Sequence, residues 1–148
     1  MKEVNLRKGK IIRKGNQIII PSSLDYLCCV DEFMEKKLKK LGVDKNLLAD
    51  CAISLSEVVS NAIHHGNLDN LEKKVKIELF PKPDQITFRV TDQGNGFDPK
   101  CLKNPIDPEC LLKEIGRGLF IVKNLMDELN FRFEPGCGTT VEITKKLK

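Results

Sequence analysis

The feature that most constrains the fold is a pair of amphipathic helical segments that follow each other directly along the chain. Apolar residues recur at helical spacing from about residue 24 to 41 and again from about 45 to 65. Gly42 ends the first run and Asp44 is a good N-cap for the second, so two separate helices are predicted. Each must bury its apolar stripe against another layer. The stripe of the second helix consists of Leu48, Cys51, Ala52, Leu55, Val59 and Ala62.

Strand patterns elsewhere in the chain provide that second layer. Short apolar or alternating segments are typical of strands, and we expect them at residues 17–20, 75–80, 85–92, 131–133 and 139–143. Ser22 or Ser23 is expected to cap the first helix, and Gly66 to end the second. A third helix is expected from Gly118 to about Leu129. This order predicts an α+β fold, with a layer of helices on one face of a mixed β-sheet.

Composition excludes several classes of protein. The chain has 148 residues, which fits one domain, and it holds no apolar run near the roughly 20 residues that span a bilayer. No apolar segment follows the charged start, so we expect no secretory signal and a cytoplasmic location. The six cysteines show no CxxC spacing, which favours reduced thiols over zinc ligands or disulfides.

Charge gives a weaker indication. The formal net charge is +4, and much of the excess lies at the two ends, including a basic segment at residues 1–15. Aromatic residues make up only 5% of the chain and tryptophan is absent, so a stacking platform for single strands is not expected. Direct binding to nucleic acid is therefore not predicted.

Polar residues gather on one side of the second helix. At 100° per residue, Glu57, Asn61 and His64 fall within one narrow sector, with Ser54 also assigned to the side opposite the apolar stripe. Glu57 could deprotonate a nucleophile, and Asn61 offers the hard oxygen that suits Mg²⁺. His64 or His65 could be an alternative base, or a capping or packing group. A solvated polar face is the plain alternative for the whole set.

Two glycine motifs follow. Asp92 begins the turn DQGNG at the end of a predicted strand, where Gly94 and Gly96 allow close backbone approach and Asp92 could accept a hydrogen bond from an amino group. The run GRGL at residues 116–119 opens a predicted helix, whose N-terminal N–H groups attract phosphate, and Arg117 could add charge-assisted contacts. The third glycine of a dinucleotide-binding fingerprint and the lysine of a Walker-type loop are both absent.

Taken in order, these motifs resemble those of the GHKL superfamily of ATP-binding proteins, which includes DNA gyrase, heat-shock chaperones, histidine kinases and mismatch-repair proteins. The likeness extends from about residue 17 to 144, and it is strongest to the small bacterial anti-sigma factor serine kinases of the RsbW and SpoIIAB type. The matching segments are SEVVSNAIHHGN at 56–67 for the N-box, DQGNGFD at 92–98 for the G1 box, GRGLFI at 116–121 for the G2 box, GTTV at 138–141 for the closing motif, and the tail LMDE at 125–128.

The resemblance implies a single domain over residues 1–148 with the Bergerat fold, a two-layer sandwich that binds ATP with Mg²⁺ under a lid at residues 98–115. It implies that Glu57 is the general base, that Asn61 coordinates the metal, and that Asp92 binds the adenine amino group. The nucleotide-binding residues carried over are Asn61, Asp92, Gly94, Gly96, Gly116, Arg117, Gly118, Leu119 and Thr140, with Thr140 near the adenine ring through water.

The resemblance also implies partners. The expected activity is phosphorylation of a serine on an anti-anti-sigma (STAS) protein, which would switch this chain between that protein and a sigma factor; relatives of this type commonly form homodimers. One departure bears on the reaction: Glu114 stands in the lid where some of these kinases carry a basic residue, and Lys113 or Arg117 would have to substitute.

Two other functions stay open at this stage. One is an ATP-binding regulatory module that binds partners without phosphoryl transfer. The other, a histidine-kinase-like catalytic domain, is disfavoured because no dimerisation helix with a phosphoacceptor histidine precedes the motifs.

Overall fold

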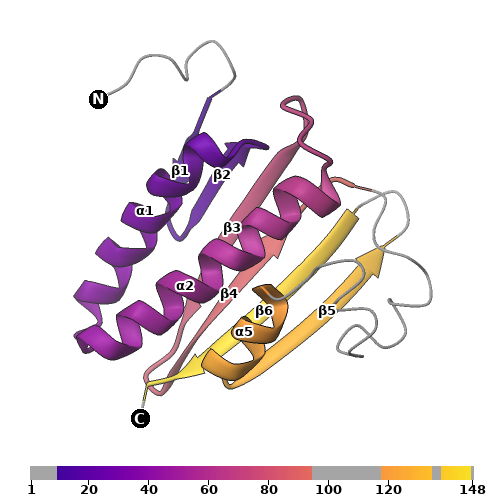
Figure 1. The fold of residues 1–148 in the computed structure, drawn as a ribbon. Coiled ribbons are helices and arrows are strands. Elements are labelled where there is room, and N and C mark those ends of the chain that lie inside the picture. The colour runs from indigo at the N-terminus through magenta and orange to yellow at the C-terminus, as the bar shows by residue number, and fades with distance from the viewer. Residues whose placement is uncertain (1–9, 95–117, 135–137, 148) are drawn as a thin grey trace.

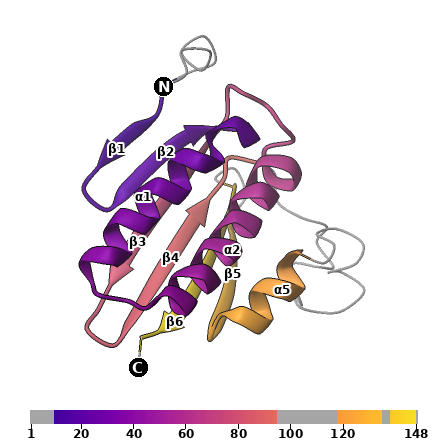
Figure 2. The ribbon, with the colours of Figure 1, turned by 60° about the vertical axis from the view of Figure 1, so that its left-hand side comes forward.

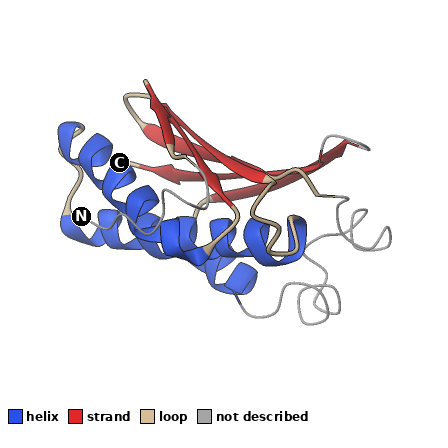
Figure 3. Ribbon diagram, turned by 90° about the horizontal axis from the view of Figure 1, so that it is seen from above, coloured by secondary structure: helices blue, strands red, loops and turns tan. Residues whose placement is uncertain are grey.

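The computed structural model describes residues 10–94, 118–134 and 138–147, and these form two layers. One layer is a six-stranded sheet, and the helices all lie against one of its faces (Figures 1 and 3). The α+β two-layer sandwich predicted from the sequence is therefore confirmed. None of the helices in these ranges is long and apolar enough to cross a membrane.

The sheet has the strand order β1-β2-β3-β4-β6-β5, and every pairing among the described strands is antiparallel. The expectation of a mixed sheet is wrong in this respect. A pair of helices connects β2 to β3 and returns the chain to the end of the sheet where β2 stopped, so β3 runs back beside it. The strands are β1 (Ile12–Lys14), β2 (Gln17–Pro21), β3 (Lys74–Pro81), β4 (Gln85–Thr91), β5 (Glu128–Glu134) and β6 (Gly138–Lys146).

The predicted helix boundaries are mostly confirmed. The Ser23 side chain accepts a hydrogen bond from the N–H of Asp25 (3.2 Å) and caps a 3₁₀ turn, η2 (Leu24–Tyr26), that leads into α1 (Leu27–Lys40). Asp44 caps α2 (Lys45–Asn61) by accepting from the N–H of Leu47 (2.8 Å). The helical path of α2 continues through a wider π-type turn, η3 (Ala62–Gly66), and ends at the expected glycine.

The core lies between α1, α2 and the covered face of the sheet. Cys51, Leu55 and Val59 from the predicted stripe of α2 are buried, and β3 and β4 alternate buried and half-buried residues as expected. Each such apolar side chain removed from water contributes about 1.5–3 kcal/mol to folding. Cys51 behaves as predicted, as a small apolar core residue with a free thiol.

The structure differs from the sequence prediction at two places. The third helix, α5 (Gly118–Leu125), is shorter than predicted, because Leu129 pairs with Ile143 in the β5–β6 ladder instead of continuing the helix. Strand β1 was not predicted from the sequence. Its three residues are all exposed, so it carries no alternating apolar pattern, and it exists through its pairing with β2.

Candidate functional site

The predicted motifs meet at one end of the sandwich, where α2 ends, β4 ends and α5 begins (Figure 2). A small cavity there joins residues that lie far apart in the sequence. Asn61 comes from α2, Asp92 follows β4 and Leu119 comes from α5. The remaining lining residues are apolar: Val58, Ala62, Val90, Phe131 and Val141. The cavity has a volume of about 10 Å³ and combines an apolar lining with the two polar side chains Asn61 and Asp92.

Asp92 is the buried polar centre of this cavity, with only 2% of its surface exposed. Its Oδ1 accepts hydrogen bonds from the backbone N–H of Gly94 (2.9 Å) and of Thr139 (3.0 Å). Oδ2 has no hydrogen-bond partner within the described residues. Burial raises the pKa of this carboxyl group, and the two backbone N–H groups and the Lys73 charge only partly oppose that shift. One carboxylate oxygen is thus fixed, and the other is left for an external donor.

Three glycines enclose Asp92. A Cβ at Gly66 would overlap Asp92 Oδ2, and a Cβ at Gly138 would overlap the Asp92 carbonyl oxygen. Gly138 also has a φ of +96°, which side chains rarely adopt. A Cβ at Gly94 would overlap the carbonyl oxygen of Gly66. Gly94 therefore permits close approach of the protein's own backbone, whereas the sequence pattern suggested only approach to a ligand.

The structure separates the two threonines of the GTTV motif. Thr140 pairs with Thr91 in the β4–β6 ladder, and their hydroxyl oxygens are 3.4 Å apart. Val141, which lines the cavity, points to the opposite face of the sheet, because side chains alternate along a strand. Thr140 therefore lies on the face away from the cavity and is not brought to the site.

Thr139, the residue before Thr140, lies on the covered face of the sheet and pairs with Asp92. It is 1% exposed, and its backbone both donates to Asp92 Oδ1 and accepts from the N–H of Asp92 (3.0 Å). Its buried hydroxyl has no hydrogen-bond partner in the described part of the chain. Sequence reasoning missed this residue, although the alternation of Thr139, Val141 and Ile143 on the covered face could have identified it.

Glu57 and Asn61 lie half-buried on the last two turns of α2. Neither side chain forms a hydrogen bond or ion pair with a described residue, so both carry uncommitted oxygens. Gly118, the first residue of α5, lies against Glu57, because a Cβ there would overlap Glu57 Oε2. Leu119 is 1% exposed and forms part of the cavity wall. The structure thus brings the helix carboxylate and the start of α5 together.

The remaining residues of the predicted polar side are placed differently. His64 Nδ1 lies 2.7 Å from Asp69 Oδ1, so this histidine is paired with the loop that follows η3. His65 is exposed. The assignment of Ser54 to the polar side is wrong: it is fully buried, because it lies on the side of α2 that packs into the core. Gly96, Gly116, Arg117 and the expected lid at 98–115 lie outside the described residues.

A buried asparagine that had no predicted role holds the turn after β4 in place. Asn67 is 0% exposed, and its Nδ2 donates to Ser22 Oγ (2.8 Å) and to the carbonyl of Lys74 (3.0 Å). Its Oδ1 accepts from the N–H of Gln93 (2.7 Å). Because Gln93 follows Asp92 directly, this network fixes the backbone on which the buried carboxylate sits.

Comparisons with known proteins bear on this geometry. The family model of the histidine kinase-like ATPase domain matches residues 20–145. The serine-protein kinase RsbW of Staphylococcus aureus is 29% identical over 136 residues, which cover 87% of this chain and 84% of that protein.

Two solved structures share the fold. The RsbU and RsbW domains of a Mycobacterium tuberculosis protein superpose with a TM-score of 0.65 and 19% identity, over 94% of this chain and 32% of that one. Full-length ShkA in complex with AMPPNP gives a TM-score of 0.55 and 19% identity, over 86% of this chain and 30% of that one.

Proposed function

The chain belongs to the histidine kinase-like ATPase domain family, and on this basis we propose that it is an ATP-dependent protein serine kinase. The family assignment confirms the resemblance to the GHKL superfamily drawn from the sequence. The proposed substrate is a serine of an anti-anti-sigma protein of the STAS type, as the likeness to a serine-protein kinase RsbW suggests.

The observation that carries the proposal is the environment of Asp92. Among the described residues, one oxygen of the buried Asp92 carboxylate has no hydrogen-bond partner, and the other accepts from the backbone of Thr139, whose buried hydroxyl also lacks a partner there. An adenine ring presents an amino donor and a neighbouring ring nitrogen acceptor at its edge. The Asp92 oxygen would accept from the amino group, and the Thr139 hydroxyl would contact the ring edge or a water bound there. The apolar walls suit the faces of the ring.

The oxygen donor at the proposed phosphate end of the site suits Mg²⁺. Magnesium usually takes one or two protein oxygens and completes its shell with phosphates and water. Asn61 would supply such an oxygen, because its carboxamide lies at the cavity and has no hydrogen-bond partner among the described residues. Bound Mg²⁺ would neutralise charge on the phosphates. Gly116, Arg117, Gly118 and Leu119 remain our proposed phosphate-side residues, and 98–115 the proposed lid.

Glu57 is the proposed general base. It would take the proton from the partner's serine hydroxyl as that oxygen bonds to the γ-phosphorus and the bond to the ADP oxygen breaks. Its position half-buried against Gly118 supports this role, since the absent Cβ leaves the carboxylate directly beside the start of α5.

The consequence would be a switch of partners in the cytoplasm. A phosphoserine adds about −1.5 to −2 charges, which breaks a fitted interface by repulsion and desolvation. The anti-anti-sigma protein would then leave, and this chain, as a monomer or a homodimer, would bind a sigma factor. Binding of ATP without transfer is the second candidate, favoured by Glu114 standing where some of these kinases carry a basic lid residue.

The test incubates the protein with γ-labelled ATP, Mg²⁺ and a STAS protein encoded nearby. We expect label on one serine, and its loss in Glu57→Gln with nucleotide affinity kept. Glu128→Gln, an exposed carboxylate on β5, is the matched control and should transfer normally. Nucleotide binding with no transfer to any STAS candidate would support the second candidate, and absence of binding would refute both.

A further inference from the structure

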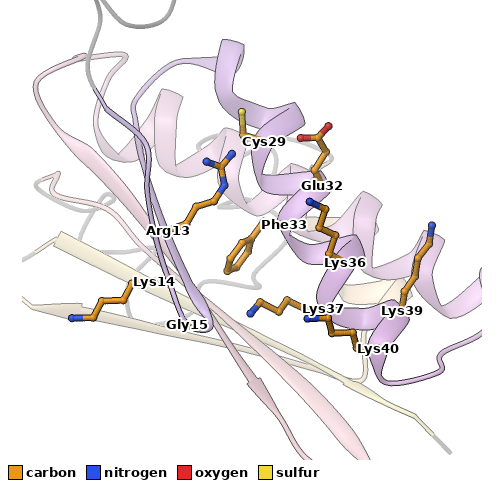
Figure 4. A pocket seen from close by; sticks show the side chains of 10 residues that line it. All are labelled: Arg13, Lys14, Gly15, Cys29, Glu32, Phe33, Lys36, Lys37, Lys39 and Lys40. Atoms are coloured by element: carbon orange, nitrogen blue, oxygen red, sulfur yellow. The ribbon is translucent and has the colours of Figure 1, made fainter. Parts of the chain in front are cut away.

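A second concavity is lined by other residues than the candidate nucleotide site. It is a groove of about 540 Å³ between the β1–β2 hairpin and α1 (Figure 4). The hairpin contributes Arg13, Lys14 and Gly15, and α1 contributes side chains from Cys29 to Lys40. Strand β1 is at the opposite edge of the sheet from β5, with β2 and β3 between it and β4. The groove therefore shares no residue with the nucleotide cavity.

The groove is strongly basic. Its lining holds one carboxylate, Glu32, and six cationic side chains: Arg13, Lys14, Lys36, Lys37, Lys39 and Lys40. Lys39 pairs with Glu35 at 3.5 Å. The other five cations have no carboxylate within 4.0 Å in the described part of the chain.

The helix alone does not explain this clustering. Lysines in the last turn of a helix are stabilised by its dipole, which accounts for Lys37, Lys39 and Lys40. It does not account for Arg13, which comes from strand β1 and points toward α1 (Figure 4). Like charges gathered from two elements repel one another, and an anionic ligand would remove that repulsion.

The floor of the groove is apolar. The Phe33 ring is 8% exposed and Cys29 is 7% exposed, and Lys37 Nζ lies 5.4 Å from the centre of the Phe33 ring. Lysine stems add further apolar surface below their charged ends. The groove therefore offers positive charge at its rim and a patch for an apolar side chain in its centre.

We propose that this groove binds an acidic segment of a partner protein, with carboxylates facing Arg13, Lys36 and Lys40 and one apolar side chain over Phe33. From Cys29 to Lys40, α1 rises about 16 Å, which matches roughly five residues of extended peptide. A nucleic acid suits the groove less well, because the lining holds a single aromatic side chain, Phe33, and successive bases would have no stacking platform. Inorganic polyphosphate has no apolar group that could contact the floor of the groove.

The test uses the full chain and fluorescence anisotropy with an eight-residue peptide of Asp and Glu around a central Leu-Phe pair. We expect a dissociation constant in the tens of micromolar, and binding at least tenfold weaker for a peptide in which Asn and Gln replace the acids. Lys36→Glu/Lys40→Glu should weaken binding at least tenfold, and Arg13→Gln should weaken it about threefold. The control Lys82→Glu/Lys123→Glu makes the same charge change at exposed sites elsewhere and should alter binding less than twofold.

Titration of every variant with a non-hydrolysable ATP analogue reports folding and keeps this proposal separate from the proposed function. Three results would overturn the docking of an acidic segment. One is no binding of the acidic peptide to the wild-type chain. Another is equal weakening in the groove variant and the control. The last is tighter binding of single-stranded RNA or tripolyphosphate than of the peptide, lost in the groove variant.

Discussion

Replacing Asp92 with asparagine should weaken nucleotide binding and stabilise the fold at the same time. The asparagine oxygen would take the place of Oδ1 and keep the two backbone hydrogen bonds, so its NH₂ group would replace Oδ2. An amino donor of the ligand would then face another donor. Loss of a hydrogen bond to a charged group costs about 1.5–3 kcal/mol, and an unsatisfied buried donor about 1–3 kcal/mol more. The affinity should fall by roughly two to four orders of magnitude.

The stability effect follows from the raised pKa of Asp92. Burial favours the neutral form in the folded state, so the folded pKa lies above the ordinary value of 3.8. The stabilising contribution of the protonated carboxyl is fully present below pH 3.8 and is lost as pH rises through the folded pKa. The ionised form of Asp92, which rising pH favours, is a buried charge that Asp92→Asn lacks. The variant should therefore be more stable at pH 7, and the difference should shrink as the pH approaches 3.8.

Calorimetric titration with a non-hydrolysable ATP analogue and Mg²⁺ measures the affinity, and urea unfolding at pH 4 and pH 7 measures the stability. Asp84→Asn, at an exposed turn between β3 and β4, is the control and should change neither quantity much. The reasoning about the site is refuted if Asp92→Asn binds within threefold of the wild type. The reasoning about the buried charge is refuted if the variant is less stable than the wild type at pH 7.

Three further outcomes can be measured. Thr139→Val should weaken nucleotide affinity about fivefold, since one hydrogen bond is worth about 1 kcal/mol. Thr140→Val should leave the affinity within twofold, and the reverse order would contradict the sheet register. Gly118→Ala should reduce phosphoryl transfer because its Cβ overlaps Glu57, and full activity would contradict that packing. Burial raises the pKa of the Cys51 thiol to about 12, whereas Cys28 is exposed. A thiol reagent at pH 8, with the labelled sites mapped by mass spectrometry, should therefore modify Cys28 at once and Cys51 only in urea. Prompt labelling of Cys51 in the native protein would contradict its burial.

Much of the fold could be predicted from the sequence, because local signals determine it. Helical periodicity and the caps at Ser23 and Asp44 located α1 and α2, and period-two alternation located β3 and β4. The chemical character of the site could also be predicted from the sequence. Glu57 and Asn61 share a helix face by spacing alone, and the turn after β4 signalled Asp92.

Tertiary structure determined the strand order and the contacts between elements, which local sequence patterns do not specify. Strand β6 lies between β4 and β5, and this register turns Thr139 toward Asp92 and Thr140 away from it. Strand β1 has no pattern of its own and forms only by pairing with β2, and that pairing brings Arg13 to the lysines of α1. The spacing of apolar residues shows which face of a helix or strand is buried, because that face is formed by residues close together in the sequence. Which elements face each other depends on the burial of the whole chain, and both the site and the basic groove arise at such contacts.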